Sequence, residues 1–240
     1  MKAQERHHLK QNEFAVTTAK LAGGLAENRD RIAIVSGAVV LIAAIAGGYF
    51  YFQKQSNDRA SAAFGAALRI EQSPVVPAPT LPGATQQAGT FATEQARNEA
   101  AVAAYQKVVD TYPSHDAGKA ARYHLAGVYL TMGRAAEAAT AYADVASRGG
   151  SSVYGAAAKL GQSQALVAQT KYDDAIKILT DLSAQRDSEL PMDGVLMELA
   201  RVCQRAGKMQ EARAAFKRVV DEFPQSGYAG EARQQLATMG

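Results

Sequence analysis

The sequence predicts an all-α protein, a solenoid of helical hairpins that follows one membrane-spanning helix. Two observations lead to this fold class. A short pattern of side chains recurs every 37 residues from about residue 91 onward, and self-similarity at such a fixed period is typical of repeat architectures. A run of 21 uncharged residues, Ile32 through Phe52, precedes the repeats and is long enough to cross a bilayer as a helix.

The composition is typical of a globular protein and argues against a nucleic-acid-binding one. Of the 240 residues, 48% are hydrophobic and 20% are charged, which fits one or two globular domains. The formal net charge is only +3 and the basic residues are scattered, so we expect no nucleic-acid partner, which needs a clustered basic face. The one cysteine, Cys203, cannot form an intramolecular disulfide.

The apolar run is expected to be a retained membrane anchor. Ile32–Phe52 contains no charge and no proline, and as a helix it would be about 31 Å long. It ends in four aromatic residues at 49–52, as expected near a membrane interface. A cleaved signal peptide is the alternative, because Ala44-Ile45-Ala46 has the form of a cleavage site. Against it, 31 residues precede the run, which continues past Ala46 into the aromatic residues.

The orientation of the anchor follows from its flanking charges. Within twenty residues of the anchor, the N-terminal and the C-terminal side each carry three basic residues. Arg29 and Arg31 lie nearest to the membrane, however, and Lys2, Arg6 and Lys10 add positive charge further out. The positive-inside rule therefore favours residues 1–31 as a polar cytoplasmic tail. The C-terminal domain then lies outside the cytoplasm, in the periplasm if the membrane is a bacterial inner membrane.

Two segments separate the anchor from the main repeat region. Residues 53–72 are expected to form a helix leading into the first repeat, with small residues at Ala60, Ala63 and Ala67. Residues 73–90 contain four prolines and no charge, and proline resists helix formation. This proline-rich loop is either a flexible linker or an extended strip that docks on a partner or on the domain itself.

Residues 91–240 are expected to form the repeat domain. An alanine is followed four residues later by a large apolar residue and seven residues later by valine or leucine. The successive sets are Ala101, Tyr105 and Val108; Ala138, Tyr142 and Val145; Ala175, Leu179 and Leu182; and Ala212, Phe216 and Val219. These offsets place all three side chains on one helical stripe, which only a neighbouring unit can bury.

The same pattern predicts the helices. Second helices of the hairpins are expected over 91–112, 135–148, 172–185 and 209–223. First helices are expected over 58–71, 116–132, 152–169 and 191–206, and a terminal helix over 227–239 would cap the last unit. Gly133 and Gly207 lie between the helices of their units, where a left-handed residue is expected; Thr170 takes that place in the third unit.

These residues resemble the tetratricopeptide repeat. Ala212, Phe216, Val219 and Pro224 match the pattern of its second helix in full. The resemblance implies a helical-hairpin solenoid of about four 37-residue units plus a C-terminal capping helix, which binds other proteins. In the third unit, Gln162 and Ser163 stand where leucine and a small residue are usual, which suggests a shifted register of its first helix.

The layout of tail, anchor and repeat domain resembles the ancillary subunit of the bacterial Sec translocon and periplasmic cell-division coordinators. This resemblance implies a protein-interaction scaffold in protein export or periplasmic chaperone hand-off. Its partners would be translocon subunits, periplasmic chaperones or exported chains. Two alternatives stay open: an envelope scaffold for cell division or outer-membrane assembly, and a membrane receptor that faces the cytoplasm.

Repeat geometry implies a peptide-binding groove lined by the first helices. The mapping gives Tyr123, Leu130, Thr131, Leu160, Gln164, Val167, Met197, Arg201, Gln204 and Arg205. Such a groove, apolar at one end and basic at the other, would hold an extended or helical apolar peptide with acidic residues towards one end. The alternative is that several of these apolar residues pack between helices. On the groove interpretation, aspartate at Tyr123 and Leu160 should weaken partner capture without unfolding the domain.

No catalytic or metal-binding constellation is recognisable, so we expect neither an enzyme nor a cofactor. His7-His8 point about 100° apart on a helix, and no acidic or cysteine cluster completes a site. His124 is expected to be a partly buried polar residue, and Cys203 a packed and inert thiol.

Overall fold

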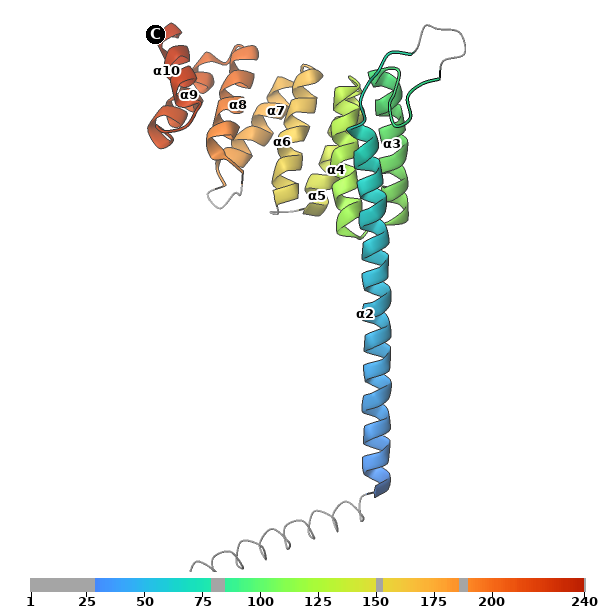
Figure 1. The fold of residues 1–240 in the computed structure, drawn as a ribbon. Coiled ribbons are helices and arrows are strands. Elements are labelled where there is room, and N and C mark those ends of the chain that lie inside the picture. Colours follow the sequence, from blue (N-terminus) through green and yellow to red (C-terminus); the bar gives the residue numbers. More distant parts are fainter. Residues whose placement is uncertain (1–28, 79–84, 150–152, 186–189, 240) are drawn as a thin grey trace, which may run out of the picture. The chain divides into compact units, whose positions relative to one another are not determined.

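The computed structural model describes residues 29–78, 85–149, 153–185 and 190–239, and within these ranges the regular structure is helical (Figure 1). His7, His8 and most of the predicted cytoplasmic tail lie outside the described residues. The helices are α2 (Arg29–Glu71), α3 (Glu94–Thr111), α4 (Asp116–Thr131), α5 (Ala135–Gly149), α6 (Val153–Ala168), α7 (Tyr172–Ser183), α8 (Met192–Arg205), α9 (Met209–Glu222) and α10 (Ala229–Thr238). The predicted all-α class is confirmed.

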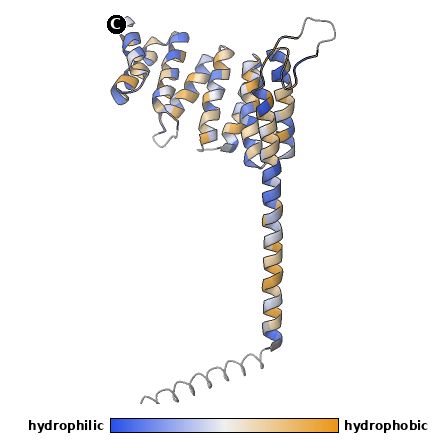
Figure 2. Cartoon of the chain, viewed as in Figure 1, coloured by the Kyte–Doolittle hydropathy of each residue, from blue (hydrophilic) through white to orange (hydrophobic). Residues whose placement is uncertain are grey.

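The chain divides into two compact units, residues 1–56 and 57–240. In the first unit, α2 carries an apolar run that is orange in Figure 2. Its large hydrophobic side chains between Ile34 and Phe52 are 59–72% exposed. An 18-residue window of this helix has a mean hydropathy of 2.1 and no buried residue. By length and composition, this helix could cross a membrane, and its exposure is unlike that of a core helix of a soluble protein.

The second unit begins within α2, which continues without a break to Glu71. Ala60 and Ala67 on this part of the helix are 0% and 1% exposed. Ala67 packs with Tyr105 of α3 and Leu125 of α4 in one hydrophobic cluster. The C-terminal part of α2 therefore takes the place of the first helix of unit one.

The 37-residue period is visible in the burial of the remaining helices. The pattern alanines Ala101, Ala138, Ala175 and Ala212 are all 0% exposed, as is Phe216. Adjacent helices in the sequence pack against each other throughout α3 to α10, so each hairpin buries its stripe against its own partner helix and the next unit.

The suggested register shift in the third unit is wrong. Ser163 lies 37 residues after Ala126 and 37 before Ala200, and these three side chains are 1%, 0% and 0% exposed. Ser163 fits the small-residue position because its hydroxyl donates a hydrogen bond to the Leu160 carbonyl oxygen at 2.7 Å. The backbone thus satisfies the one polar atom that an alanine would lack.

The terminal helix α10 continues the same period. Ala121, Ala158, Val195 and Ala232 lie 37 residues apart on α4, α6, α8 and α10, and all are at most 1% exposed. α10 is therefore equivalent to the first helix of a further unit. Leu236 and Met239 pack against the large hydrophobic cluster of the last units, which covers the end of the solenoid as predicted.

The turns between paired helices adopt the expected left-handed conformation. Gly133 and Gly207 have φ angles of 74° and 73°, and Thr170 has a φ of 60°. In the third unit, the Lys171 N–H donates to the Leu166 carbonyl oxygen at 2.9 Å, which closes the end of α6. Of these three turns, this one holds a β-branched residue in the left-handed backbone conformation that glycine adopts readily.

The proline-rich loop is closed at its base by hydrogen bonds between its first residues and Phe91, which directly follows the loop. The Val76 N–H donates to the Phe91 carbonyl oxygen at 2.9 Å, and the Phe91 N–H donates to the Pro74 carbonyl oxygen at 3.0 Å. Because Phe91 belongs to this pairing, α3 begins at Glu94, three residues later than predicted, with Thr93 as its N-cap. Residues 79–84 at the tip lie outside the described residues.

Candidate protein-binding face of the first helices

The predicted groove residues of α4 and α6 form a strip of mixed exposure. Tyr123 and Leu130 are half-buried against a central hydrophobic cluster, and Leu160 and Val167 are half-buried against the larger C-terminal cluster. Thr131 and Gln164 are exposed. We call these six residues the α4–α6 strip. Each of its apolar members both supports the core and presents part of its surface to solvent.

The predicted groove residues of α8 are placed differently. Met197 is 0% exposed, so its assignment to the ligand face is wrong. Arg201 pairs with Glu231 of α10 at 2.8 Å, and the Gln204 amide donates to the Gln235 side-chain oxygen at 3.0 Å. Among the predicted residues of α8, Arg205 is exposed. α10 thus occupies this end of the face, in the way that a further first helix would.

Aromatic side chains enclose the other end of the strip. The Tyr123 ring makes edge contacts with Tyr142 at 5.6 Å and with Tyr154 at 6.3 Å between centroids. Tyr154, on the first turn of α6, is 50% exposed. Sequence reasoning missed Tyr154 because it precedes the repeat positions that define the groove.

Tyr123 and Leu160 each pack against a hydrophobic cluster, so Tyr123→Asp or Leu160→Asp would disturb packing. Thr131 and Gln164 are therefore better sites for probing binding.

Tyr142 is the buried support of this aromatic group. Its ring lies against Gly161 of α6, so closely that a Cβ atom on residue 161 would come within 2.5 Å of the ring. Burial, together with the nearby Tyr123 and Glu71, raises the pKa of Tyr142 to about 12. The hydroxyl is therefore neutral at physiological pH, and the residue serves packing rather than proton transfer.

A polar group joins α2, α3 and α4. The Tyr105 hydroxyl donates to the Glu71 carboxylate, and His124 Nδ1 lies 3.1 Å from the same carboxylate oxygen. The hydrogen bond from His124 is the main reason that the pKa of Glu71 is lowered, against the opposing effect of burial. Desolvation by burial, together with the hydrogen bond to the same carboxylate, raises the pKa of Tyr105. Aromatic stacking of Tyr105 on His124 at 5.5 Å holds the group together.

Glu71 and His124 of this polar group line a small cavity that reaches the strip at Thr131. The cavity holds about 280 Å³ and includes Glu71, Arg97, His124 and Thr131 among its lining residues. His124 is 33% exposed at its side chain, which agrees with the partly buried polar residue that the sequence predicts. Glu71 was not predicted because the proline-rich loop places it outside the 37-residue period.

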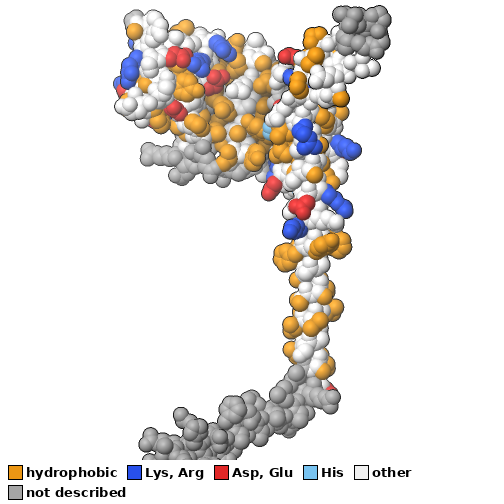
Figure 3. Space-filling model, viewed as in Figure 1, with side chains coloured by type: hydrophobic (Ala, Val, Ile, Leu, Met, Phe, Trp, Pro, Cys, Tyr) orange, Lys and Arg blue, Asp and Glu red, His pale blue; other side chains and the backbone are white. Residues whose placement is uncertain are grey.

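The chemistry of this face suits binding rather than catalysis. Figure 3 shows hydrophobic side chains gathered over α4, α6 and α8, while charged side chains gather towards α10. Cys203 is fully buried, and burial raises the pKa of its thiol, which makes it a poor nucleophile. Within the part of the chain that the structure describes, no group of three or more His, Cys, Asp or Glu side chains is placed to hold a metal ion.

The fold and this face define the class of protein: a helical-repeat protein that binds other proteins. Residues 26–238 match the tetratricopeptide repeat-like domain family. The match covers most of the chain, so the chain belongs to this family. Tetratricopeptide repeats are typically non-catalytic interaction scaffolds. No curated protein matches the sequence at a significant level.

Solved structures confirm the fold. The repeats of a protein described as a kinesin light chain from Podosopora anserina are 19% identical, with a TM-score of 0.56 over 76% of this chain and 86% of that chain. A tetratricopeptide repeat protein from Parabacteroides merdae is 12% identical, with a TM-score of 0.50 over 61% of this chain and 55% of that chain. At these identities the likeness concerns the fold alone.

Proposed function

We propose that this protein is a single-pass, membrane-anchored scaffold that binds other proteins during export beside a bacterial translocon. The tail before α2 lies in the cytoplasm, and the repeat domain lies in the periplasm. The observation that carries the proposal is the half-exposed apolar and aromatic α4–α6 strip in a chain of the tetratricopeptide repeat-like family. The resemblance of the whole layout to the ancillary translocon subunit supports the process.

The anchor supports this function through proximity. A binding face that is held at the membrane meets chains emerging there at a high effective concentration, which compensates for weak contacts. The strip suits such weak contacts because its apolar side chains are already supported by the core and need little ordering on binding. An extended or helical apolar segment can cover it without displacing a structural element.

The proposal is tested by purifying the full-length chain from membranes and identifying the proteins that accompany it. Gln164→Arg or Thr131→Arg places a charge on the exposed part of the strip. Thr180→Arg is the matched control, because Thr180 is exposed on the second helix α7 of the same domain. Translocon subunits, periplasmic chaperones and exported chains should be recovered with the wild type and the control, and lost with both strip variants.

Two results would contradict the proposal. Recovery of the same partners with the strip variants would show that another surface binds them. Exclusively cytoplasmic partners would reverse the orientation and favour a cytoplasm-facing receptor, whereas division or outer-membrane assembly proteins would move the scaffold to another process.

A further inference from the structure

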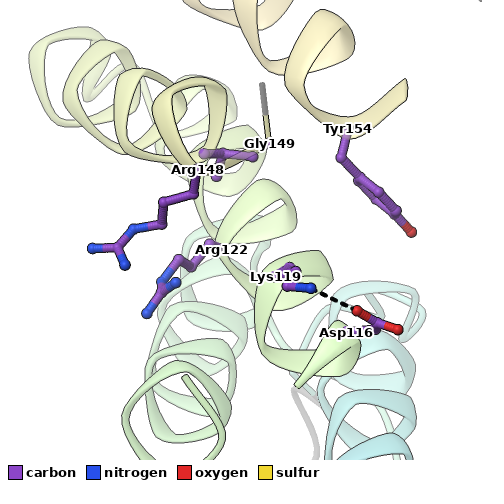
Figure 4. A pocket seen from close by; sticks show the side chains of 7 residues that line it. Asp116, Lys119, Arg122, Arg148, Gly149 and Tyr154 are labelled. Carbon is purple, nitrogen blue, oxygen red and sulfur yellow. Dashed lines mark hydrogen bonds and ion pairs between the residues drawn. The ribbon is translucent and has the colours of Figure 1, made fainter. Parts of the chain in front are cut away.

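A second cavity, of about 400 Å³, lies between α4, α5 and α6 at the aromatic end of the α4–α6 strip (Figure 4). Three basic side chains line it: Lys119 and Arg122 of α4 and Arg148 of α5. Val145 and Tyr154 also line it. Tyr154 belongs at the same time to the aromatic group around Tyr123, so one lining residue of the cavity contacts the strip.

The charges of this cavity do not balance. Arg122 and Arg148 share one carboxylate, that of Asp144, at 3.7 and 2.7 Å. Lys119 pairs with Asp116 at 2.8 Å. Three positive groups thus face two negative ones, and the Asp116 side chain is 96% exposed, so water screens that pair strongly. The cavity therefore retains a positive potential that would attract one more carboxylate.

The walls of the cavity are apolar. Val145 is 5% exposed and Tyr154 presents half of its surface, and the aliphatic stems of the basic residues add to this lining. A cavity with a cationic rim and an apolar wall fits one acidic side chain next to an apolar one. A single net positive charge is too little for a polyanion such as a nucleic acid, whose binding needs many phosphate contacts.

We propose that this cavity receives an aspartate or glutamate side chain of the polypeptide segment bound on the α4–α6 strip. The preferred partner segment is then apolar, with an acidic residue at the end that lies towards the N-termini of α4 and α6. The inference rests on the proposed function and adds the polarity of the ligand. In the groove predicted from the sequence, the basic residues Arg201 and Arg205 both belong to the last unit, but Glu231 already neutralises Arg201 there.

Peptide binding to the full-length chain in detergent micelles tests the inference. Three fluorescent peptides share one leucine- and valine-rich segment and carry Glu-Glu at the amino end, Glu-Glu at the carboxyl end, or Gln-Gln at both ends. One acidic peptide should bind about threefold more tightly or better than the Gln-Gln peptide, because a charge pair at a partly desolvated site adds roughly that much. The gain should decrease as salt is raised.

Charge-removing variants show where the acidic end of the peptide binds. Lys119→Gln combined with Arg148→Gln should abolish the gain, and both side chains are more than half exposed, so the fold is retained. Arg205→Gln is the matched control, because Arg205 is an exposed basic residue of α8. It should leave the gain unchanged. Circular dichroism melting curves confirm that each variant is folded.

The outcomes separate the two proposals. Equal binding of all three peptides would overturn the cavity assignment and leave the strip as the binding face. A gain that is lost in Arg205→Gln but kept in the double variant would place the acidic end at α8 and also overturn it. Binding of none of the peptides would contradict the proposed function, and the cavity assignment would fall with it.

Discussion

Thr170 stands where the equivalent turns of the neighbouring units carry glycine, and its φ of 60° is left-handed. This conformation costs a residue with a Cβ about 1–2 kcal/mol, whereas glycine adds roughly 0.5–1 kcal/mol of unfolded-state entropy. We therefore expect Thr170→Gly to raise the free energy of unfolding by about 0.5–1 kcal/mol, measured by urea denaturation. Gly207→Thr should lower it, and a destabilised Thr170→Gly would show that the threonine side chain makes a compensating contact.

The contact between Gly161 and Tyr142 leads to a second prediction. A Cβ at position 161 would lie 2.5 Å from the Tyr142 ring, so Gly161→Ala must displace a buried aromatic side chain. We expect a loss of about 1–3 kcal/mol of stability in thermal or urea unfolding, despite the higher helix propensity of alanine. Gly65→Ala is the control, since its nearest neighbour is the Arg69 guanidinium at 3.8 Å, and it should stabilise by up to about 1 kcal/mol.

Glu71 makes stability depend on acidic pH. Its pKa is lowered in the folded state from an ordinary value of 4.5, mainly by the hydrogen bond with His124. The contribution is therefore complete above pH 4.5 and is lost as the pH falls through the lower, folded-state pKa. We expect Glu71→Gln to cost about 1–2 kcal/mol at pH 7, with a gap to wild type that narrows towards pH 3. A gap that stays constant from pH 7 to pH 3 would show that the carboxylate charge is not involved.

Individual side chains were only partly predictable from the repeat pattern. The core positions that define the pattern, such as Ala138 and Phe216, could be assigned because a buried stripe repeats with the period. The residues of the binding face could not be assigned in this way. Tyr123 and Met197 occupy equivalent positions, yet Tyr123 is half-buried and Met197 is fully buried. The two positions differ in the neighbouring helix that covers them. That helix belongs to another unit, so the sequence of one unit does not predict the burial of its face residues.

At the scale of elements, α10 performs the stabilising role of a cap. It contributes Ala229 and Ala232 to the buried residues, and Leu236 and Met239 pack against the C-terminal cluster. Ending the chain at Gly227 should cost several kcal/mol, because burying a leucine or methionine side chain contributes about 1.5–3 kcal/mol. The thermal midpoint should fall and size-exclusion chromatography should show association through the exposed apolar end.

A point variant separates packing from charge at this cap. Glu231→Gln removes only the ion pair with Arg201, whose partners are both more than a third exposed, and it should change stability by less than about 1 kcal/mol. An equal loss in Glu231→Gln and in the truncated chain would contradict the view that apolar packing of α10 is the main stabilising contribution.

The helices themselves were largely predictable from the sequence, because a fixed period with helical spacing leaves few alternatives. In unit one the first helix was also predicted, over residues 58–71, although it does not follow the period. There the proline-rich loop separates α2 from α3 and moves the first helix out of the 37-residue period. Phe64, Glu71 and their contacts with His124 are a consequence of that insertion, and periodicity alone could not have shown them.

At the scale of the whole molecule, the sequence joins an apolar helix to a protein-binding repeat domain in one chain. The apolar run of α2 is long and apolar enough to cross a membrane, and the α4–α6 strip presents partly exposed apolar side chains. Apolar side chains on a repeat face recognise classes of segment rather than single proteins.

Photocrosslinking in native membranes from a probe at Gln164 tests whether the strip contacts exported chains, since Gln164 is an exposed residue of the strip. A probe at Lys177, exposed on α7 in the same unit, is the control. We predict adducts with translocon subunits, periplasmic chaperones or emerging secreted chains from Gln164 and not from Lys177. Equal adducts from both probes would contradict the strip as the binding face, and adducts only with cytoplasmic proteins from Gln164 would contradict the periplasmic location.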